Sequence, residues 1–190
     1  MMNKKEIILQ HLYQPYKESY RGPLRLPGST QMVLGDGNPH AQLMLIGEAP
    51  GREEDLQGKP FVGRSGKLIE QVLRHAGHQR DDLFITNAVK SRPEQNRTPT
   101  PEEIAKARKL LLAEIITISP RVICTLGAVA LRAILNEEVH SLAAFRGKPL
   151  TWQQYTIVPT YHPAYILRQP AAYKLFEHDL KIALALAYTP

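Results

Sequence analysis

Residues 83–93 read LFITNAVKSRP. The first part, Leu83 to Asn87, is a β-branched apolar run that predicts a buried strand. This strand ends abruptly in an amide side chain, that of Asn87. The residues that follow carry cations and a proline, which is typical of a loop. The stretch therefore predicts an apolar strand that delivers a polar side chain into a loop.

The same unit recurs along the chain, with helices between the strands. Strands are predicted at residues 42–46, 121–126 and 155–160 as well, and helices at residues 65–76, 101–118, 127–135 and 171–187. Residues 100–103, TPEE, form a capping box with proline at the first helical position. Strands that alternate with helices predict an α/β fold with a mostly parallel sheet covered on both faces. In such sheets ligands bind at the carboxyl ends of the strands.

The length and composition predict one domain over residues 1–190, with residues 1–40 as an irregular arm, or a short helix, packed on it. No apolar run reaches the length of a membrane helix, and no signal peptide is recognisable, so a cytoplasmic location is expected. The formal net charge of +6 favours an anionic partner, nucleic acid first, over an inert basic surface. The single cysteine, Cys124, lies in an apolar run and is predicted as a core residue.

The loop after the first strand, residues 47–66, reads GEAPGREEDLQGKPFVGRSG. It is long for such a connection, and long loops on a compact scaffold are often functional. A solvated acidic loop with its aromatic residue in the core is the alternative. Residues 58–65 resemble a phosphate-binding loop, but arginine stands where that loop needs lysine, and no strand directly precedes it. The candidate side chains of this loop are Glu48, Glu53, Glu54, Asp55 and Phe61.

Asn87 offers an acceptor and two donors, a set that matches the N3–H and O4 edge of uracil and mismatches cytosine. A turn asparagine with satisfied hydrogen bonds is the alternative. The loop behind it carries Lys90, Arg92 and Arg97, which suit phosphate contacts.

The loop after the last strand, residues 160–170, reads TYHPAYILRQP. His162 stands before a proline, which holds its backbone extended. The residues after it could wedge into a duplex and hold it open. A core turn with a structural histidine is the alternative. The wedge candidates are Tyr165, Ile166, Leu167 and Arg168.

Four motifs, GEAPGREED, GKPFVGRSG, ITNAVKSRPEQNRTPTPEE and YHPAYILR, together resemble those of the family 4 uracil-DNA glycosylases over roughly residues 33–185. The resemblance implies a three-layer α/β/α domain with a central four-stranded parallel sheet, and removal of uracil from DNA to leave an abasic site. It implies that Phe61 stacks on the flipped base, that Asn87 reads its edge and that His162 donates to O2. Glu48 and Ala49 match the water-positioning motif, where Ala49 offers a backbone N–H, and Glu54 matches a second acidic position.

The chain departs from this family at an iron–sulfur site. Family 4 enzymes typically hold a [4Fe–4S] cluster on four cysteines, whose positions here correspond to about Ser19, Gly22, Ser91 and Ala107. Thiolates hold such clusters, so no cluster and no metal cofactor is predicted. The structural task of the cluster is expected to pass to packing between the N-terminal arm and the loop at Ser91. A cross-linking branch of the superfamily carries a His-bearing insertion after the asparagine motif, which this chain lacks, so ordinary turnover is expected.

The sequence therefore predicts a monofunctional uracil-DNA glycosylase that acts as a monomer on uracil-containing DNA, with Glu48, Glu54 and His162 as catalytic candidates. Two alternatives stay open. One is a non-catalytic uracil- or DNA-binding protein, and the other is a glycosylase for another deaminated base such as hypoxanthine.

Overall fold

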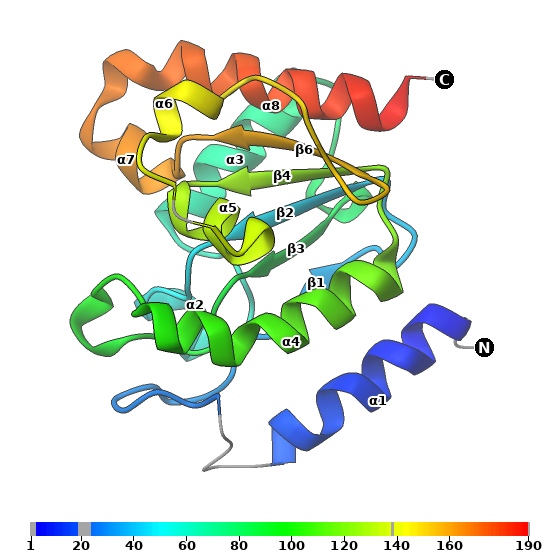
Figure 1. Ribbon diagram of the computed structural model, residues 1–190, viewed down its shortest axis with the longest axis vertical. Helices are drawn as coiled ribbons and strands as arrows, with labels where there is room; N and C mark the ends of the chain where they lie inside the picture. Colours follow the sequence, from blue (N-terminus) through cyan, green and yellow to red (C-terminus); the bar gives the residue numbers. More distant parts are fainter. Residues whose placement is uncertain (1–2, 19–23, 138, 190) are drawn as a thin grey trace.

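The computed structural model describes residues 3–18, 24–137 and 139–189. Strands and helices alternate as predicted (Figure 1). The strands are β1 (Asp36–Gly37), β2 (Leu43–Gly47), β3 (Phe84–Asn87), β4 (Val122–Leu126), β5 (Leu150–Trp152) and β6 (Tyr155–Thr160). The helices are α1 (Lys4–Glu18), α2 (Arg52–Gln57), α3 (Arg64–His75), α4 (Pro101–Ile118), α5 (Ala128–Leu135), α6 (Leu142–Phe145), α7 (Pro163–Arg168) and α8 (Tyr173–Tyr188), with 3-10 turns at Arg80–Asp82, Glu94–Asn96 and Pro170–Ala172.

The six strands form one sheet in the order β1-β3-β2-β4-β6-β5. The four central strands are parallel, which confirms the predicted core of the sheet. The predicted strand count is corrected from four to six, because β1 and β5 add short antiparallel edges to β3 and β6. These edge strands are two and three residues long, too short to show an alternating pattern in the sequence.

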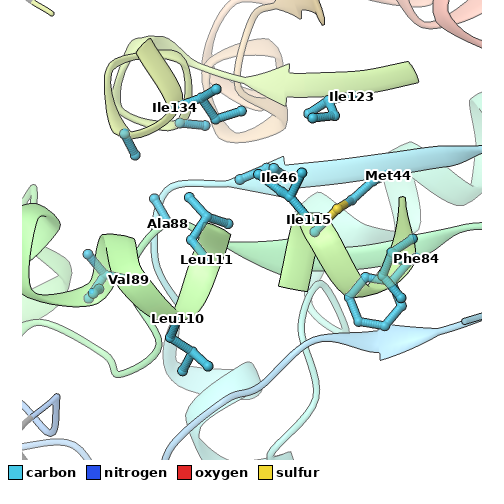
Figure 2. Close-up of a cluster of buried hydrophobic side chains, with 14 of the residues drawn as sticks. Met44, Ile46, Phe84, Ala88, Val89, Leu110, Leu111, Ile115, Ile123 and Ile134 are labelled. Atoms are coloured by element: carbon cyan, nitrogen blue, oxygen red, sulfur yellow. The ribbon is translucent and has the colours of Figure 1, made fainter. Parts of the chain in front are cut away.

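Alternate residues of the central strands point to opposite faces of the sheet and meet different helices. Met44 and Ile46 of β2 pack in an apolar cluster with α1, α4 and α5, whereas Leu43 and Leu45 pack with α3 and α8. Figure 2 shows side chains of α4 pointing toward those of β2 on the first face. In Figure 1, α4 and α8 lie on opposite sides of the sheet, and α1 lies outside α4. The three-layer α/β/α class is therefore confirmed, with α1 added outside it.

Of the two expected forms of the N-terminal arm, a helix is present over Lys4–Glu18, whereas residues 24–35 are irregular. α1 spans 15 residues although it contains Pro15. Leu9 and Tyr13 bury one side of α1 against α4, while Ile7 and Ile8 stay exposed. These exposed isoleucines blur the helical period, so the helical pattern of these residues is weak.

The boundary of α4 follows from its predicted cap. The hydroxyl of Thr100 accepts a hydrogen bond from the backbone N–H of Glu103, and the Glu103 carboxylate accepts one from the backbone N–H of Thr100. Pro101 occupies the first helical position, as predicted. Across the described ranges, no helix combines the length and apolarity needed to cross a membrane.

Candidate active site

A cleft of about 740 Å³ lies at the carboxyl ends of the central strands, where α2 and α7 also lie (Figure 1). Strand registers place Gly47 beside Asn87 and Leu126 beside Thr160, so the loops that follow these residues start from one edge. The sequence predicted this edge as the site. Of the predicted site residues, the cleft is lined by Glu48, Ala49, Glu54, Phe61, Asn87, Arg97, His162, Leu167 and Arg168.

Phe61, from the segment between α2 and α3, and Asn87, the last residue of β3, converge over Gly47 at the end of β2. Their side chains are 5% and 1% exposed. A Cβ atom on Gly47 would lie 2.4 Å from both the Asn87 Oδ1 and the Phe61 ring. Any side chain at this position would therefore push the ring or the amide out of place, so the glycine is part of the cleft floor.

The Asn87 side chain presents an unused acceptor to the cleft. Its Oδ1 is buried and has no hydrogen-bond partner within the part of the chain that the structure describes. The backbone beyond it is fixed, because Ala88 and Val89 donate their N–H groups to the carbonyls of Gly47 and Glu48. A buried acceptor without a partner costs about 1–3 kcal/mol, a cost that a bound N–H donor would remove.

Phe61 is held in an unusual backbone conformation. Its φ of 53° lies in the left-handed region, which is unfavourable for an aromatic residue. Arg80 donates hydrogen bonds to the carbonyls of Phe61 and Pro60, at 3.1 and 2.6 Å, and lies 3.6 Å from the Asp36 carboxylate. Gly66 leaves room for the Phe61 carbonyl, which a Cβ at Gly66 would meet at 1.7 Å. Arg80 was missed in the sequence, because its contacts cross about twenty positions and follow no local pattern.

His162 lines the cleft and also caps α7. Its Nδ1 accepts a hydrogen bond from the backbone N–H of Ala164 at 3.1 Å, and its ring centroid lies 6.1 Å from that of Phe61. Burial, with a smaller contribution from the Arg168 charge, lowers the pKa of His162 to about 4. The imidazole is thus neutral at pH 7, and because Nδ1 accepts, the proton sits on Nε2. The interpretation as a structural turn residue therefore applies to this histidine, and its ring also lies in the lining of the cleft.

The two candidate carboxylates differ in their partners. Glu54 accepts backbone N–H bonds from Gly51 and Gly63, at 3.1 and 2.8 Å, so it ties the start of α2 to that of α3. Glu48 makes no side-chain hydrogen bond to any residue that the structure describes, and it is half-buried. Burial raises the pKa of Glu48, and the Arg132 charge opposes that rise. Of these two carboxylates, Glu48 is the one with both oxygens available to a ligand or water.

The remaining acidic residues of the first loop do other work. Asp55 is buried and accepts the backbone N–H of Thr30 at 3.0 and 3.1 Å, so it fastens the N-terminal arm. Glu53 lines the cleft but is exposed to solvent. The alternative of a solvated acidic loop with its aromatic residue in the core holds for Glu53 and for Phe61, which packs in the buried apolar cluster with α3 and α8, but not for Asp55.

The predicted phosphate contact of Lys90 is wrong. Lys90 is fully buried, and its ammonium donates to the Thr86 hydroxyl and the Asn87 carbonyl, each at 2.6 Å, and to the Glu114 carboxylate. A phosphate oxygen of DNA cannot reach a side chain with no exposed surface. The sequence could not show this, because the carboxylate that makes burial of the charge tolerable lies 24 positions away.

Of the other predicted DNA contacts, three line the cleft, namely Arg97, Leu167 and Arg168, and three do not, namely Arg92, Tyr165 and Ile166. Arg97 is exposed and makes two hydrogen bonds to Glu103, at 2.6 and 2.8 Å. Leu167 is 42% exposed at the cleft, beside Arg168. Tyr165 is exposed outside the lining and packs against the ring of Tyr161 at 4.9 Å. Among the predicted DNA contacts, Arg92 is half-buried and Ile166 is buried.

The residues present do not fit an iron–sulfur cluster. The chain has one cysteine, Cys124, which is buried within β4. Ser91 instead bonds the N-terminal arm: its Oγ donates to the Leu24 carbonyl at 2.8 Å and accepts the Leu26 N–H at 2.9 Å. Ala107 packs in the core, and residues 19 and 22 lie outside the described residues. A neutral hydroxyl that already has two backbone partners cannot replace a thiolate ligand.

Comparison with known proteins agrees with this geometry. Residues 34–186 match the family described as the Uracil DNA glycosylase superfamily. The chain belongs to the uracil-DNA glycosylase superfamily. It is 42% identical to a type-4 uracil-DNA glycosylase of Thermotoga maritima, over 88% of this chain and 87% of that protein. It is 41% identical to a type-4 enzyme of Sulfurisphaera tokodaii, over 85% and 77%, and 37% identical to one of Pyrobaculum aerophilum, over 90% and 91%.

Proposed function

We propose that this protein excises uracil from DNA by hydrolysing the N-glycosidic bond, which leaves an abasic site. The observation that carries the proposal is the buried Oδ1 of Asn87, which has no hydrogen-bond partner among the described residues and belongs to a side chain that lines the cleft beside the Phe61 ring. The relatives named as uracil-DNA glycosylases cover most of the chain and support the same activity.

Recognition of uracil follows from the donors and acceptors of the cleft. The Asn87 Oδ1 accepts the N3 proton of uracil, and its amide NH₂ donates to O4. Cytosine has no N3 proton and carries a donor at position 4, so both contacts would be mismatched. The Phe61 ring supplies a flat apolar surface for the base to stack on.

Stabilisation of the leaving base falls to neutral donors. Cleavage of the C1′–N1 bond builds negative charge on the base and positive charge on the sugar. The Nε2–H of His162 donates to O2 of uracil, where negative charge develops. The neutral ring donates through Nε2–H, and the Ala164 N–H fixes this tautomer because it occupies Nδ1.

Glu48 is the carboxylate that positions the attacking water. Its oxygens make no hydrogen bonds to the described residues, whereas those of Glu54 hold two glycine N–H groups. When ionised, Glu48 orients water and stabilises the cationic sugar by its charge. Ala49, next to it in the cleft lining, offers a backbone N–H for the same water. Glu54 then has a supporting role, because it shapes the loop that carries Phe61.

The DNA has to release the base into the cleft before these groups can act. Leu167 and Arg168 lie at the rim, where an apolar side chain can fill the space left by the flipped nucleotide and a cation can meet phosphate. Arg97 lines the same cleft, from the loop between β3 and α4. No step of this mechanism uses a metal, and action as a monomer stays a prediction.

The decisive experiment uses duplex oligonucleotides that carry one uracil, one hypoxanthine or only the ordinary bases. After incubation with the protein, alkali should break the strand at uracil and nowhere else. Breakage at hypoxanthine would extend the substrate range. An intact uracil strand together with a gel shift would replace the proposal with a non-catalytic binding protein. A His162→Ala variant, expected to be at least about 100-fold slower, controls for contaminating activity.

A further inference from the structure

We propose that Lys90 is a positioning residue that sets the orientation of Asn87 through its backbone carbonyl, and so controls excision from inside the core. This inference rests on the proposed function of the cleft. It assigns to Lys90 a role that does not require contact with DNA.

Lys90 makes a direct hydrogen bond to the backbone of Asn87. Its Nζ donates to the carbonyl oxygen of Asn87 at 2.6 Å, three residues back along the chain. This bond closes a turn directly behind the side chain that reads the base. On the other side of the turn, Ala88 and Val89 donate to the carbonyls of Gly47 and Glu48. The Asn87 peptide is therefore held from the sheet on one side and from Lys90 on the other.

Lys90 is itself held in place by two further hydrogen bonds. The ammonium also donates to the Thr86 hydroxyl at 2.6 Å and to the Glu114 carboxylate, and these three side chains have no exposed surface. Three donors with three partners leave no free direction for the ammonium. A buried lysine with these partners is a rigid support for the carbonyl it holds.

The hydrogen bonds that hold Lys90 continue through Glu114 to other parts of the fold. The second oxygen of Glu114 accepts from the Tyr13 hydroxyl at 2.7 Å and from the Gly35 N–H at 3.2 Å. Tyr13 belongs to α1 and Glu114 to α4. Through Lys90 and Glu114, Asn87 is thus connected to α1 and α4 on one face of the sheet, and not only to β3, which it ends.

The choice between uracil and cytosine is sensitive to the orientation of the Asn87 amide. Uracil and cytosine differ at the Asn87 amide by donor and acceptor positions alone, so discrimination needs the amide in one fixed orientation. A displacement of about 1 Å of a group that contacts the reacting molecule can cost about 100-fold in rate. Loss of the Lys90 bond would free the Asn87 carbonyl and remove one of the restraints on that orientation.

The test compares Lys90→Met, which removes the ammonium, with the double variant Lys90→Met/Glu114→Gln, which also removes the charge left unpaired. Thr86→Val serves as the matched control at the same buried site, because it leaves the Lys90 bond to Asn87 in place. Lys109→Met on the exposed side of α4 controls for the loss of a lysine. Urea unfolding, DNA affinity and single-turnover excision of uracil are measured for each protein.

We expect the double variant to recover most of the stability lost in Lys90→Met, because no uncompensated charge stays buried. Its excision rate should stay about 100-fold below that of the unaltered protein, with DNA affinity within about threefold, since the displaced group acts on the base and not on the phosphates. Thr86→Val should lose much less in rate. A double variant that is stable and excises uracil at the unaltered rate would overturn the proposal, as would Thr86→Val and the double variant slowing equally.

A substrate-free measurement separates this inference from the proposed function. The side-chain amide signals of Asn87 in ¹H–¹⁵N spectra, assigned by their absence in Asn87→Asp, report its environment directly. They should shift in the double variant and stay in place in Lys109→Met. Unshifted signals would contradict the positioning role even if the protein had no activity on uracil. Shifted signals with an inactive unaltered protein would contradict only the proposed function.

Discussion

The Nδ1 of His162 accepts a hydrogen bond from the backbone N–H of Ala164, two residues further on, at 3.1 Å. This single bond caps α7 and at the same time decides which ring nitrogen carries the proton. Because Nδ1 is the acceptor, the ring nitrogen that carries the proton and can donate in the cleft is Nε2.

The pH dependence of His162 follows from its environment. Burial and the nearby Arg168 lower the pKa of His162 to about 4, against about 6.5 in the unfolded chain. Between these values the unfolded state binds the additional proton, so this residue makes the protein less stable as the pH falls from 6.5 toward 4. The ring should show a titration midpoint near 4 by NMR. A midpoint near 6.5 would mean that the imidazole is solvated and could carry a charge in the cleft.

Substitutions of Glu48 and Glu54 are expected to affect different properties of the protein. Glu48→Gln should lower kcat by about 100-fold or more, because it removes the group that orients water. Glu54→Gln should mainly lower stability, by about 1–3 kcal/mol, because one of two backbone N–H bonds is lost. Both variants are compared for kcat and for urea unfolding. Equal losses of kcat at equal folded fraction would assign water activation to the pair.

The acid limb of the rate profile should belong to Glu48. Burial raises the pKa of Glu48 above its usual 4.5, and the ionised form is the active one, so the rate should fall as the pH drops through this raised value. The limb should be absent in Glu48→Gln. Its persistence at the same pH in that variant would point to another group.

Asn87→Asp should relax the choice between uracil and cytosine. A carboxylic acid can donate one hydrogen bond and accept another, so it can pair with the cytosine edge when protonated. Excision of cytosine should appear, and the rate on uracil should fall by about 100-fold or more, as expected when a site polar group is mismatched. Unaltered preference would refute the role of Asn87 in reading the base. Asn38→Asp, in the turn before β2, is a control outside the cleft lining.

Ser91 should stabilise the fold in place of a metal centre. Ser91→Ala leaves the Leu24 carbonyl and the Leu26 N–H without their partner, at a cost of about 1–3 kcal/mol. Ser141→Ala is the control, since the Ser141 side chain makes no capping hydrogen bond. EDTA should leave the unfolding transition of the unaltered protein unchanged. Absorbance at about 400 nm that disappears with iron removal would contradict the predicted absence of a cluster.

Arg80 should be needed to hold Phe61. Arg80→Lys keeps the charge beside Asp36 but cannot hold two carbonyls in the planar fork that arginine provides. The left-handed backbone of Phe61 would then relax, with a loss of about tenfold in kcat/KM on the scale of a slightly displaced contact group. Arg74→Lys, on the exposed side of α3, should show no loss. An equal loss in both variants would exclude a specific role for Arg80.

The sequence by itself determined the alternation of strands and helices, the parallel central sheet and the edge where the site lies, because these depend on local apolar periods and on caps such as Thr100. It also indicated Phe61, Asn87 and His162, whose residue types suit a flipped base. Only the tertiary structure decided that Lys90, which carries the same charge as Arg92, is buried beside Glu114 and cannot meet phosphate. It likewise separated Glu48 from Glu54 and revealed Arg80. Burial and hydrogen-bond partners in these cases come from segments far apart in the chain, and no local pattern encodes them.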